Sequence, residues 1–206
     1  MIRRRAVLLV PLSYPAALLP PFATAWSQTL VKPSPIIDDL SDPTGLSALG
    51  TRWQLVTDQV LGGVSRGALS REEVAGRPAL VMRGDVRLEN NGGFVQMALD
   101  LARPDAAGGG TLDARAWQGL EIDVHGAPQA YSLHLRTTDL ERPWQSYRQG
   151  FEARPEWQRL RLAFADFAAY RTEAPLDLTR LRRLGIVAIG RAFTADLAVG
   201  GLRFYG

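Results

Sequence analysis

The sequence contains two glycine-rich turns, DQVLGGVS at residues 58–65 and LENNGGF at residues 88–94. Each follows a run that reads as a strand, and each places two adjacent glycines beside polar side chains. Glycine adopts positive φ without a steric penalty, so a Gly-Gly pair permits a sharp turn or a close approach of the backbone. Asn91-Gly92 is in addition a dipeptide favoured in short β-hairpins. The two turns predict a β-protein whose polar groups gather at its turns.

Alternation of apolar and polar residues continues outside these turns. Four runs show it, at residues 94–99, 120–125, 131–136 and 159–164. Such alternation is typical of strands with one buried face, as in an antiparallel sandwich. Short strands, regular turn signals and few helical signals favour a β-sandwich or jelly roll. We also predict a β-bulge at Gly200-Gly201 and a helical turn after Asp177, with Asp177 as its N-cap.

The N-terminus of the 206-residue chain has the pattern of an export signal. Three arginines, Arg3 to Arg5, precede an uncharged stretch that runs to Val31 and contains the small-residue sequence ATA at residues 23–25. We predict an export signal at residues 1–25, a linker with a candidate first edge strand at residues 26–50, and a single sandwich domain at residues 51–206. The expected location is the bacterial periplasm, and prolines in the apolar stretch argue against a stable membrane span.

Charge and cysteine content exclude several classes of function. The chain has 24 basic and 21 acidic residues. Removal of residues 1–25 takes away three arginines and no acidic residue, which leaves 21 of each sign. The high pI is therefore no evidence for a nucleic-acid partner, and none is expected. The chain has no cysteine, which excludes disulfides, thiolate metal sites and cysteine nucleophiles.

The two glycine turns, together with other segments, resemble the complex I intermediate-associated protein 30 family. The shared segments are Trp53, the turns at 58–65 and 88–94, GLEI at 119–122, YSLHLRT at 131–137, SYRQ at 146–149, WQ at 157–158, FADF at 164–167 and LGI at 184–186. This resemblance covers residues from about Ile36 to the C-terminus. It implies a galactose-binding-like jelly-roll sandwich and a non-enzymatic role, since the eukaryotic members are assembly factors, or chaperones, for respiratory complex I.

Two groups of polar and aromatic residues are candidates for a binding site. Asp58, Ser65, Asn90 and Asn91 flank the glycine turns, where they either line a ligand cleft or cap the turns themselves. The second group is expected to share one solvent-facing sheet surface or its rim. It consists of Arg136, Trp144, Tyr147 and Gln149. Aromatic and arginine side chains are enriched at interface hot spots, although tryptophans of a sandwich also fill its core.

No arrangement in the sequence supports catalysis, a cofactor or a metal. His125 and His134 occupy outward positions of strands, where they are expected to be solvated, and no zinc spacing surrounds them. No nucleophile elbow accompanies them. Glu121 with Asp123, or Asp139 with Glu141, are pairs of a kind that is common on sheet surfaces.

The sequence thus predicts a non-enzymatic binding or assembly-factor module that recognises an unidentified protein partner through a sheet face or loop end. The alternative is a carbohydrate-binding module of the cell envelope with a galactose-binding-like fold. A hydrolase that uses surface carboxylates is the third and least supported hypothesis.

Overall fold

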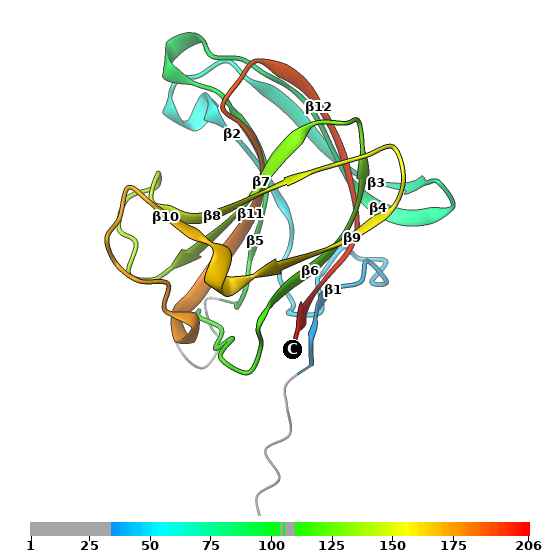
Figure 1. The fold of residues 1–206 in the computed structure, drawn as a ribbon. Helices are drawn as coiled ribbons and strands as arrows, with labels where there is room; N and C mark the ends of the chain where they lie inside the picture. The colour runs from blue at the N-terminus through cyan, green and yellow to red at the C-terminus, as the bar shows by residue number, and fades with distance from the viewer. Residues whose placement is uncertain (1–33, 104, 106–109) are drawn as a thin grey trace, which may run out of the picture. The chain divides into compact units, whose positions relative to one another are not determined.

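Two antiparallel sheets pack face to face in the computed structural model, which describes residues 34–103, 105 and 110–206 apart from the side chain of Asn91 (Figure 1). The first sheet has the order β3 (Arg66–Val74), β4 (Arg77–Val86), β12 (Phe193–Tyr205), β6 (Gly119–Gly126) and β9 (Gln158–Ala163), and β1 (Ile36–Asp38) also pairs with β12. The second sheet has the order β10 (Ala168–Tyr170), β8 (Ser146–Glu152), β7 (Ala130–Thr137), β11 (Leu181–Ile189), β5 (Phe94–Asp100) and β2 (Gln54–Thr57). The predicted all-β sandwich is confirmed.

The core lies between the sheets and follows the alternation of the sequence. The inward side chains of β6, Leu120, Ile122 and Val124, are buried, and Leu133 and Leu135 of β7 are buried opposite them. Burial of each such side chain contributes about 1.5–3 kcal/mol relative to exposure. Because one apolar face of each sheet is used in this core, the outer faces are left for polar residues and for function.

Both glycine turns connect one sheet to the other. Short 3-10 turns lie in them: η1 (Asp58–Leu61) leads from β2 to β3, and η2 (Glu89–Asn91) leads from β4 to β5. A hairpin at Asn91-Gly92 is therefore a wrong expectation, because the strands that flank it belong to different sheets. Since β2 pairs with β5 and β3 pairs with β4, the two crossovers lie side by side.

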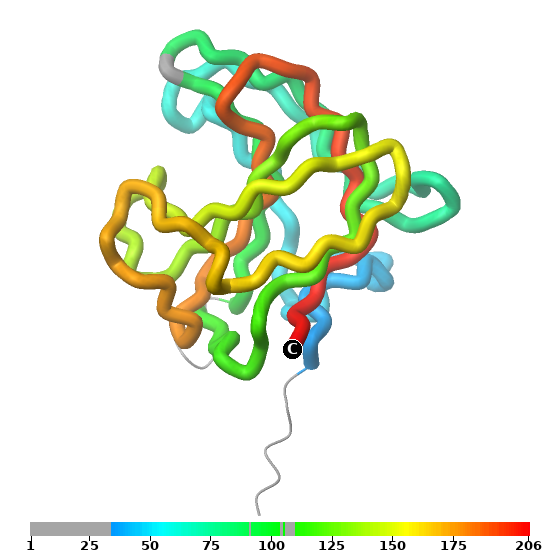
Figure 2. The backbone as a smooth tube through the Cα atoms, in the orientation of Figure 1, coloured from blue at the N-terminus to red at the C-terminus, as the bar shows by residue number. Residues whose placement is uncertain are grey.

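The start of the described chain pairs with its end. In β1, which falls in the segment expected to be a linker with a candidate first edge strand, Ile36 lies opposite Arg203 and Asp38 opposite Leu202. Figure 2 shows this blue segment beside the red C-terminal strand. The register of β12 against β6 shifts between Val199 and Gly201, which confirms the predicted bulge.

The remaining 3-10 turns are η3 (Phe164–Asp166) and η4 (Leu178–Arg180). The side chain of Asp177 caps η4 by accepting a hydrogen bond from the Thr179 N–H. The predicted export signal at residues 1–25 lies outside the described residues. Among the residues that are described, no helix has the length and apolar character needed to cross a membrane.

Candidate functional site

Asp58 joins the two glycine turns. Its buried carboxylate accepts hydrogen bonds from the backbone N–H groups of Ser65 at 2.9 Å, Gly93 at 2.5 Å and Phe94 at 3.3 Å. The Ser65 hydroxyl donates a fourth at 2.5 Å. Burial raises the pKa of this carboxyl, but the hydrogen bonds from Ser65 and Gly93 outweigh burial and hold the pKa below its usual value. Asp58 is therefore an ionised link between the crossovers.

The glycines of both turns make room for this link. A Cβ on Gly63 would lie 2.3 Å from Asp58 Cγ, and a Cβ on Gly92 would lie 2.4 Å from Asp58 Oδ2. Gly62 has a different role, because it ends η1 in the left-handed conformation with a φ of 88°. The Asn90 side chain crosses to the first turn and donates to the Gly62 carbonyl at 3.2 Å.

The predicted turn residues thus come together, and three of them hold the turns in place. Asp58, Ser65 and Asn90 make hydrogen bonds within or between the crossovers. The side chain of Asn91 lies outside what the structure describes. Asp58 also lines a groove next to the turns, so the crossovers form one border of a cavity.

This groove, about 470 Å³ in volume, lies over the outer face of the second sheet. Outward residues of β5, β11, β7 and β8 form its floor. The strand register places Gln96 opposite Val187, and Gly185 opposite His134, which in turn lies opposite Arg148. A Cβ on Gly185 would lie 2.4 Å from Gln96 Nε2, so the glycine lets the Gln96 amide lie across β11.

Exposed apolar side chains concentrate around the groove. Of the residues described, six have large, exposed apolar or aromatic side chains, and five of these line the groove: Val60, Leu61, Leu88, Trp144 and Tyr170. We call Val60, Leu61 and Leu88 the aliphatic wall. They belong to the crossovers next to β2 and β5, at one edge of the second sheet. Tyr170 ends β10 at the opposite edge, and Trp144 lies in the loop between β7 and β8.

The groove is also positively charged. Five arginines line it: Arg136, Arg148, Arg171, Arg182 and Arg183. Arg183 pairs with Asp100, with 2.7 Å between Nε and Oδ1, whereas the other four have no ion-pair partner among the described residues. Asp58 is the one carboxylate among the described lining residues, and its oxygens already accept hydrogen bonds. The groove therefore has an excess of positive charge.

Arg136 orders the loop between β7 and β8. Its guanidinium donates to four carbonyl oxygens, those of Leu140 at 3.0 Å, Arg142 at 2.8 Å, Pro143 at 2.9 Å and Gln145 at 2.6 Å. Burial lowers the pKa of Arg136, and the nearby cations Arg182 and Arg183 lower it further. Arg136 was expected to face solvent and bind a partner directly. In the structure its hydrogen bonds fix the loop that carries Trp144.

Arg148 and Arg171 lie at the opposite edge of the sheet from the aliphatic wall. The Arg148 guanidinium carbon is 3.4 Å from the centroid of the Tyr170 ring, and that of Arg171 is 5.4 Å from it. Arg148 Nε also donates to the Ser146 hydroxyl at 2.8 Å. Both cations therefore lie close to the ring of one tyrosine. We call Arg148, Arg171 and Tyr170 the arginine wall.

The expected common surface of Arg136, Tyr147 and Gln149 is wrong. Tyr147 lies opposite Leu135 in the register of β7 and β8, so it shares the inner face with Leu135. Its ring is buried and its hydroxyl donates to the carbonyls of residues 174 and 175. Gln149 is two residues after Tyr147 on β8 and therefore points to the same inner face. Its side-chain oxygen is buried without a hydrogen-bond partner. Trp144, by contrast, borders the groove and is 46% exposed.

The expectation that His134 is solvated is also wrong. His134 does face outward and lines the groove, but its side chain is buried there, and its Nε2 atom has no hydrogen-bond partner. Burial lowers its pKa to about 3, with a further contribution from Arg148, so the imidazole is neutral at physiological pH. His125 lies on the first sheet against Trp157, with 5.5 Å between ring centroids.

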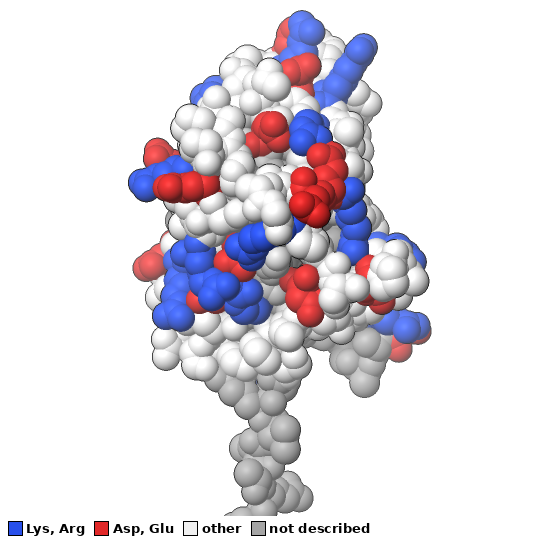
Figure 3. Space-filling model, turned by 90° about the vertical axis from the view of Figure 1, so that its right-hand side faces the viewer, with Lys and Arg blue, Asp and Glu red and all other residues white. Residues whose placement is uncertain are grey.

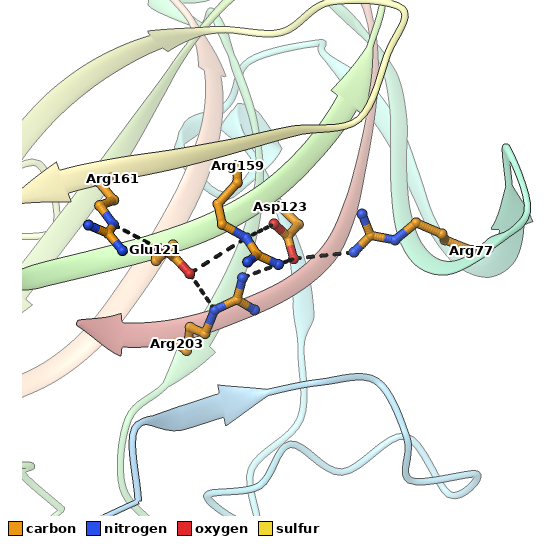
Figure 4. A network of polar contacts seen from close by, with 6 residues as sticks. All are labelled: Arg77, Glu121, Asp123, Arg159, Arg161 and Arg203. Atoms are coloured by element: carbon orange, nitrogen blue, oxygen red, sulfur yellow. Dashed lines mark hydrogen bonds and ion pairs between the residues drawn. The ribbon is translucent and has the colours of Figure 1, made fainter.

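Glu121 and Asp123 face outward from β6 but are buried under four arginines (Figure 4). Figure 3 shows acidic and basic side chains next to one another on this side of the molecule. The contacts are Arg161 Nε to Glu121 at 2.8 Å, Arg203 Nε to Glu121 at 2.6 Å, Arg159 Nε to Asp123 at 2.9 Å, Arg203 Nη2 to Asp123 at 3.1 Å and Arg77 Nη2 to Asp123 at 3.2 Å.

These contacts keep both carboxyls ionised. The hydrogen bond from Arg161 and the contact with Arg203 lower the pKa of Glu121 against the effect of burial. Burial raises the pKa of Asp123, but Arg159 and Arg203 outweigh it and the net pKa is lowered. A general acid needs a raised pKa, so this pair is not set up for acid catalysis. No group of three or more acidic or histidine side chains able to hold a metal is found in the described part of the chain.

Comparison with known proteins identifies the family. Residues 43–199 match the sequence family described as complex I intermediate-associated protein 30. The chain belongs to the complex I intermediate-associated protein 30 family. In this chain the glycine turns have a structural role, because they let Asp58 join two crossovers beside the groove. Comparison with curated protein sequences gives no match.

Solved structures show the same fold with little sequence similarity. A family 11 carbohydrate-binding module of the cellulosomal cellulase Lic26A-Cel5E of Clostridium thermocellum has a TM-score of 0.63 and 10% identity, over 84% of this chain and 94% of the module. The same kind of module from this organism, in complex with a beta-1,3-1,4-mixed-linked tetrasaccharide, has a TM-score of 0.62, 10% identity and coverage of 84% and 95%. An exo-beta-agarase matches with a TM-score of 0.51 and 9% identity over 83% of this chain and 25% of the enzyme. At such identities the similarity is evidence for the fold of this chain and for nothing more.

Sequence reasoning missed most of the groove. Neither Leu61 nor Leu88 was singled out, although both are large apolar residues in turns, where polar residues are usual, and that contrast was a usable signal. Arg148, Arg171 and Tyr170 gave no such signal, because their convergence depends on which strands pair.

Proposed function

We propose that this family member is a non-catalytic binding module that recognises a protein partner through the groove, as an assembly factor does. The observation that carries the proposal is the concentration of exposed apolar residues: of six in the described chain, five line this one groove. Three of them form the aliphatic wall at one edge of the groove, and clustered exposed apolar side chains are typical of interaction sites. A non-catalytic role is supported by the chemistry of the groove, in which Asp58 is fully hydrogen-bonded and His134 is neutral.

The aliphatic wall favours a protein partner over a sugar. Val60 and Leu61 are 70% and 59% exposed, and such branched side chains are buried well by apolar side chains of another protein. Aromatic faces that are free to stack favour sugar binding, but of the two exposed aromatic rings at the groove, that of Tyr170 already has the Arg148 guanidinium 3.4 Å from its centroid. The groove is therefore better suited to a protein segment.

One observation favours carbohydrate as the second candidate. Trp144 is exposed at the border of the groove, in a fold that resembles carbohydrate-binding modules. A glycan array tests this function. Binding to a glycan that is lost in Trp144→Ala would support it, and an array without signal counts against it.

Affinity capture with matched variants tests the proposed protein-binding function. The variant Leu61→Ser/Leu88→Ser removes two exposed members of the aliphatic wall, and we expect it to lose the proteins that the wild type retains. Ile36→Ser is the control, because Ile36 is the sixth exposed large apolar residue and lies on β1, away from the groove. Equal capture by all three proteins would contradict the proposal.

We further propose that the chain is exported and cleaved after Ala25, on the basis of the arginines and small residues near its N-terminus. The N-terminal sequence of the mature protein checks this. An intact Met1 on protein from the cytoplasm would contradict it.

A further inference from the structure

We propose that the groove binds an extended protein segment that carries acidic as well as apolar side chains, with the acidic groups against Arg148 and Arg171 and the apolar groups against the aliphatic wall. This inference rests on the proposed function and adds the chemistry of the partner. Its basis is the charge of the groove and the separation of its two walls.

Most of the positive charge of the groove has no acidic partner among the described residues. Of the five lining arginines only Arg183 has an acidic partner in the described residues, through Asp100. On the first sheet, by contrast, Glu121 and Asp123 are covered by arginines at ion-pair distance. The same fold therefore pairs Glu121 and Asp123 with arginines on one outer face, and leaves four of the five groove arginines on the other without an ion-pair partner among the described residues.

Arg148 is partly withdrawn from water, and the exposed Arg171 lies close to it, beside the same Tyr170 ring. Burial lowers the pKa of Arg148, contact with Tyr170 opposes this effect, and Arg171 adds to the lowering. Like charges held near one another in a region of reduced dielectric repel each other. A carboxylate relieves this repulsion, and its two oxygens match the planar guanidinium fork of arginine. The arginine wall is thus suited to an anionic group.

The two walls require a ligand with two kinds of group. The strand order of the second sheet places β10 and β8 at one edge, and β5 and β2 at the other. The arginine wall lies at the first edge, and the aliphatic wall lies at the crossovers of the second. A chain that spans this sheet surface meets cations on one side and Val60, Leu61 and Leu88 on the other. Alternating side chains of an extended peptide point to opposite sides and match this arrangement.

Selection from a random peptide display library tests the proposal with the full chain. We expect peptides enriched on the wild type to combine Asp or Glu with large apolar residues, and to be lost on Arg148→Gln/Arg171→Gln. Measured by fluorescence anisotropy, a selected peptide should bind this variant at least about tenfold more weakly than it binds the wild type. The wild type should show a similar loss of affinity when each acidic residue of the peptide is replaced by its amide. Arg154→Gln is the matched control, because Arg154 is exposed between β8 and β9 and does not line the groove.

Three other results would contradict the proposal, each in a different way. Selected peptides that are neutral but depend on Leu61 and Leu88 would overturn the acidic chemistry and leave the protein-binding function standing. Binding of polygalacturonate that depends on Arg148 and Arg171 but not on Leu61 and Leu88 would assign the arginines to an anionic polysaccharide instead. Failure to enrich any peptide would count against both proposals. Equal thermal unfolding of the variants and the wild type shows that a loss of binding is not a loss of folding.

Discussion

Asp58 explains why two separate sequence motifs have the same form. Each motif supplies a glycine that leaves space for this carboxylate, Gly63 from the first and Gly92 from the second. Each also supplies backbone donors to it, from Ser65 and Gly93. A buried charge is stable only when its hydrogen bonds are satisfied, and here four donors surround one side chain. The motif is therefore a binding site for Asp58 itself.

We expect Asp58→Asn to lower the free energy of unfolding at neutral pH by about 2–3 kcal/mol, because the amide group presents donors to N–H groups that need an acceptor. The folded-state pKa of Asp58 is lowered, so its contribution is complete above the unfolded-state pKa of about 3.9 and is lost as the pH falls through the lower folded-state value. The difference between variant and wild type should therefore shrink on acidification. Urea unfolding at several pH values measures it, with the exposed Asp166→Asn as control; a difference that is constant with pH would contradict the argument.

A second prediction isolates the steric role of the glycines. Gly63→Ala should destabilise by about 1–3 kcal/mol, because the new Cβ would lie 2.3 Å from Asp58 Cγ. In the Asp58→Ala background the same substitution should cost much less, since the space is then empty. Gly150→Ala is the control: the nearest atom to its Cβ is 3.8 Å away and its φ is not positive, so a change within about 0.5 kcal/mol is expected. Additive effects of Gly63→Ala and Asp58→Ala would refute the steric explanation.

At the scale of elements, alternation predicted strands well but not the faces they share. The runs at 120–125 and 131–136 became β6 and β7. In β8 the parity was correct, because Tyr147 and Gln149 do point to the same side. Which side that is depends on the register with β7, where Tyr147 lies opposite Leu135, and a single sequence does not contain this register. The same limit hid the crossovers, since a turn between sheets and a hairpin within one use similar residues.

The loop between β7 and β8 depends on one side chain. Arg136 donates to four of its carbonyl oxygens, and lysine cannot replace it because an ammonium group has no planar fork. We expect Arg136→Lys to speed amide hydrogen exchange in residues 140–145, with little effect on exchange elsewhere. The variant should also weaken binding of a ligand in the groove, because Trp144 would no longer be held in place. The Arg183 guanidinium pairs with Asp100 and not with this loop, so Arg183→Lys should leave exchange in the loop unchanged. Unaltered exchange in Arg136→Lys would show that the loop is held by other contacts.

At the scale of the whole molecule, the two outer faces differ in how far their charged side chains form ion pairs. On the first sheet the carboxylates Glu121 and Asp123 lie beneath arginines that neutralise them (Figure 4). On the second sheet the arginines of the groove have no such partners in the described chain, apart from Arg183. Composition could not predict this asymmetry, because the residues 26–206 contain equal numbers of basic and acidic side chains. The net charge of the chain therefore hides a local excess that only the fold creates.

The same substitution should have different effects on stability on the two faces. Arg203→Gln removes contacts of 2.6 Å to Glu121 and 3.1 Å to Asp123, so we expect a loss of about 1–3 kcal/mol in the free energy of unfolding. Arg148→Gln removes one of several mutually repelling cations, so it should be neutral or stabilising, as is common where function opposes stability. Raising the ionic strength shortens the Debye length from about 10 Å at 0.1 M to 3 Å at 1 M, and should reduce any gain from Arg148→Gln. Chemical unfolding by urea at low and high salt measures both. If Arg148→Gln destabilises as much as Arg203→Gln at low salt, the groove arginines are structural, and the unpaired charge does not belong to a binding site.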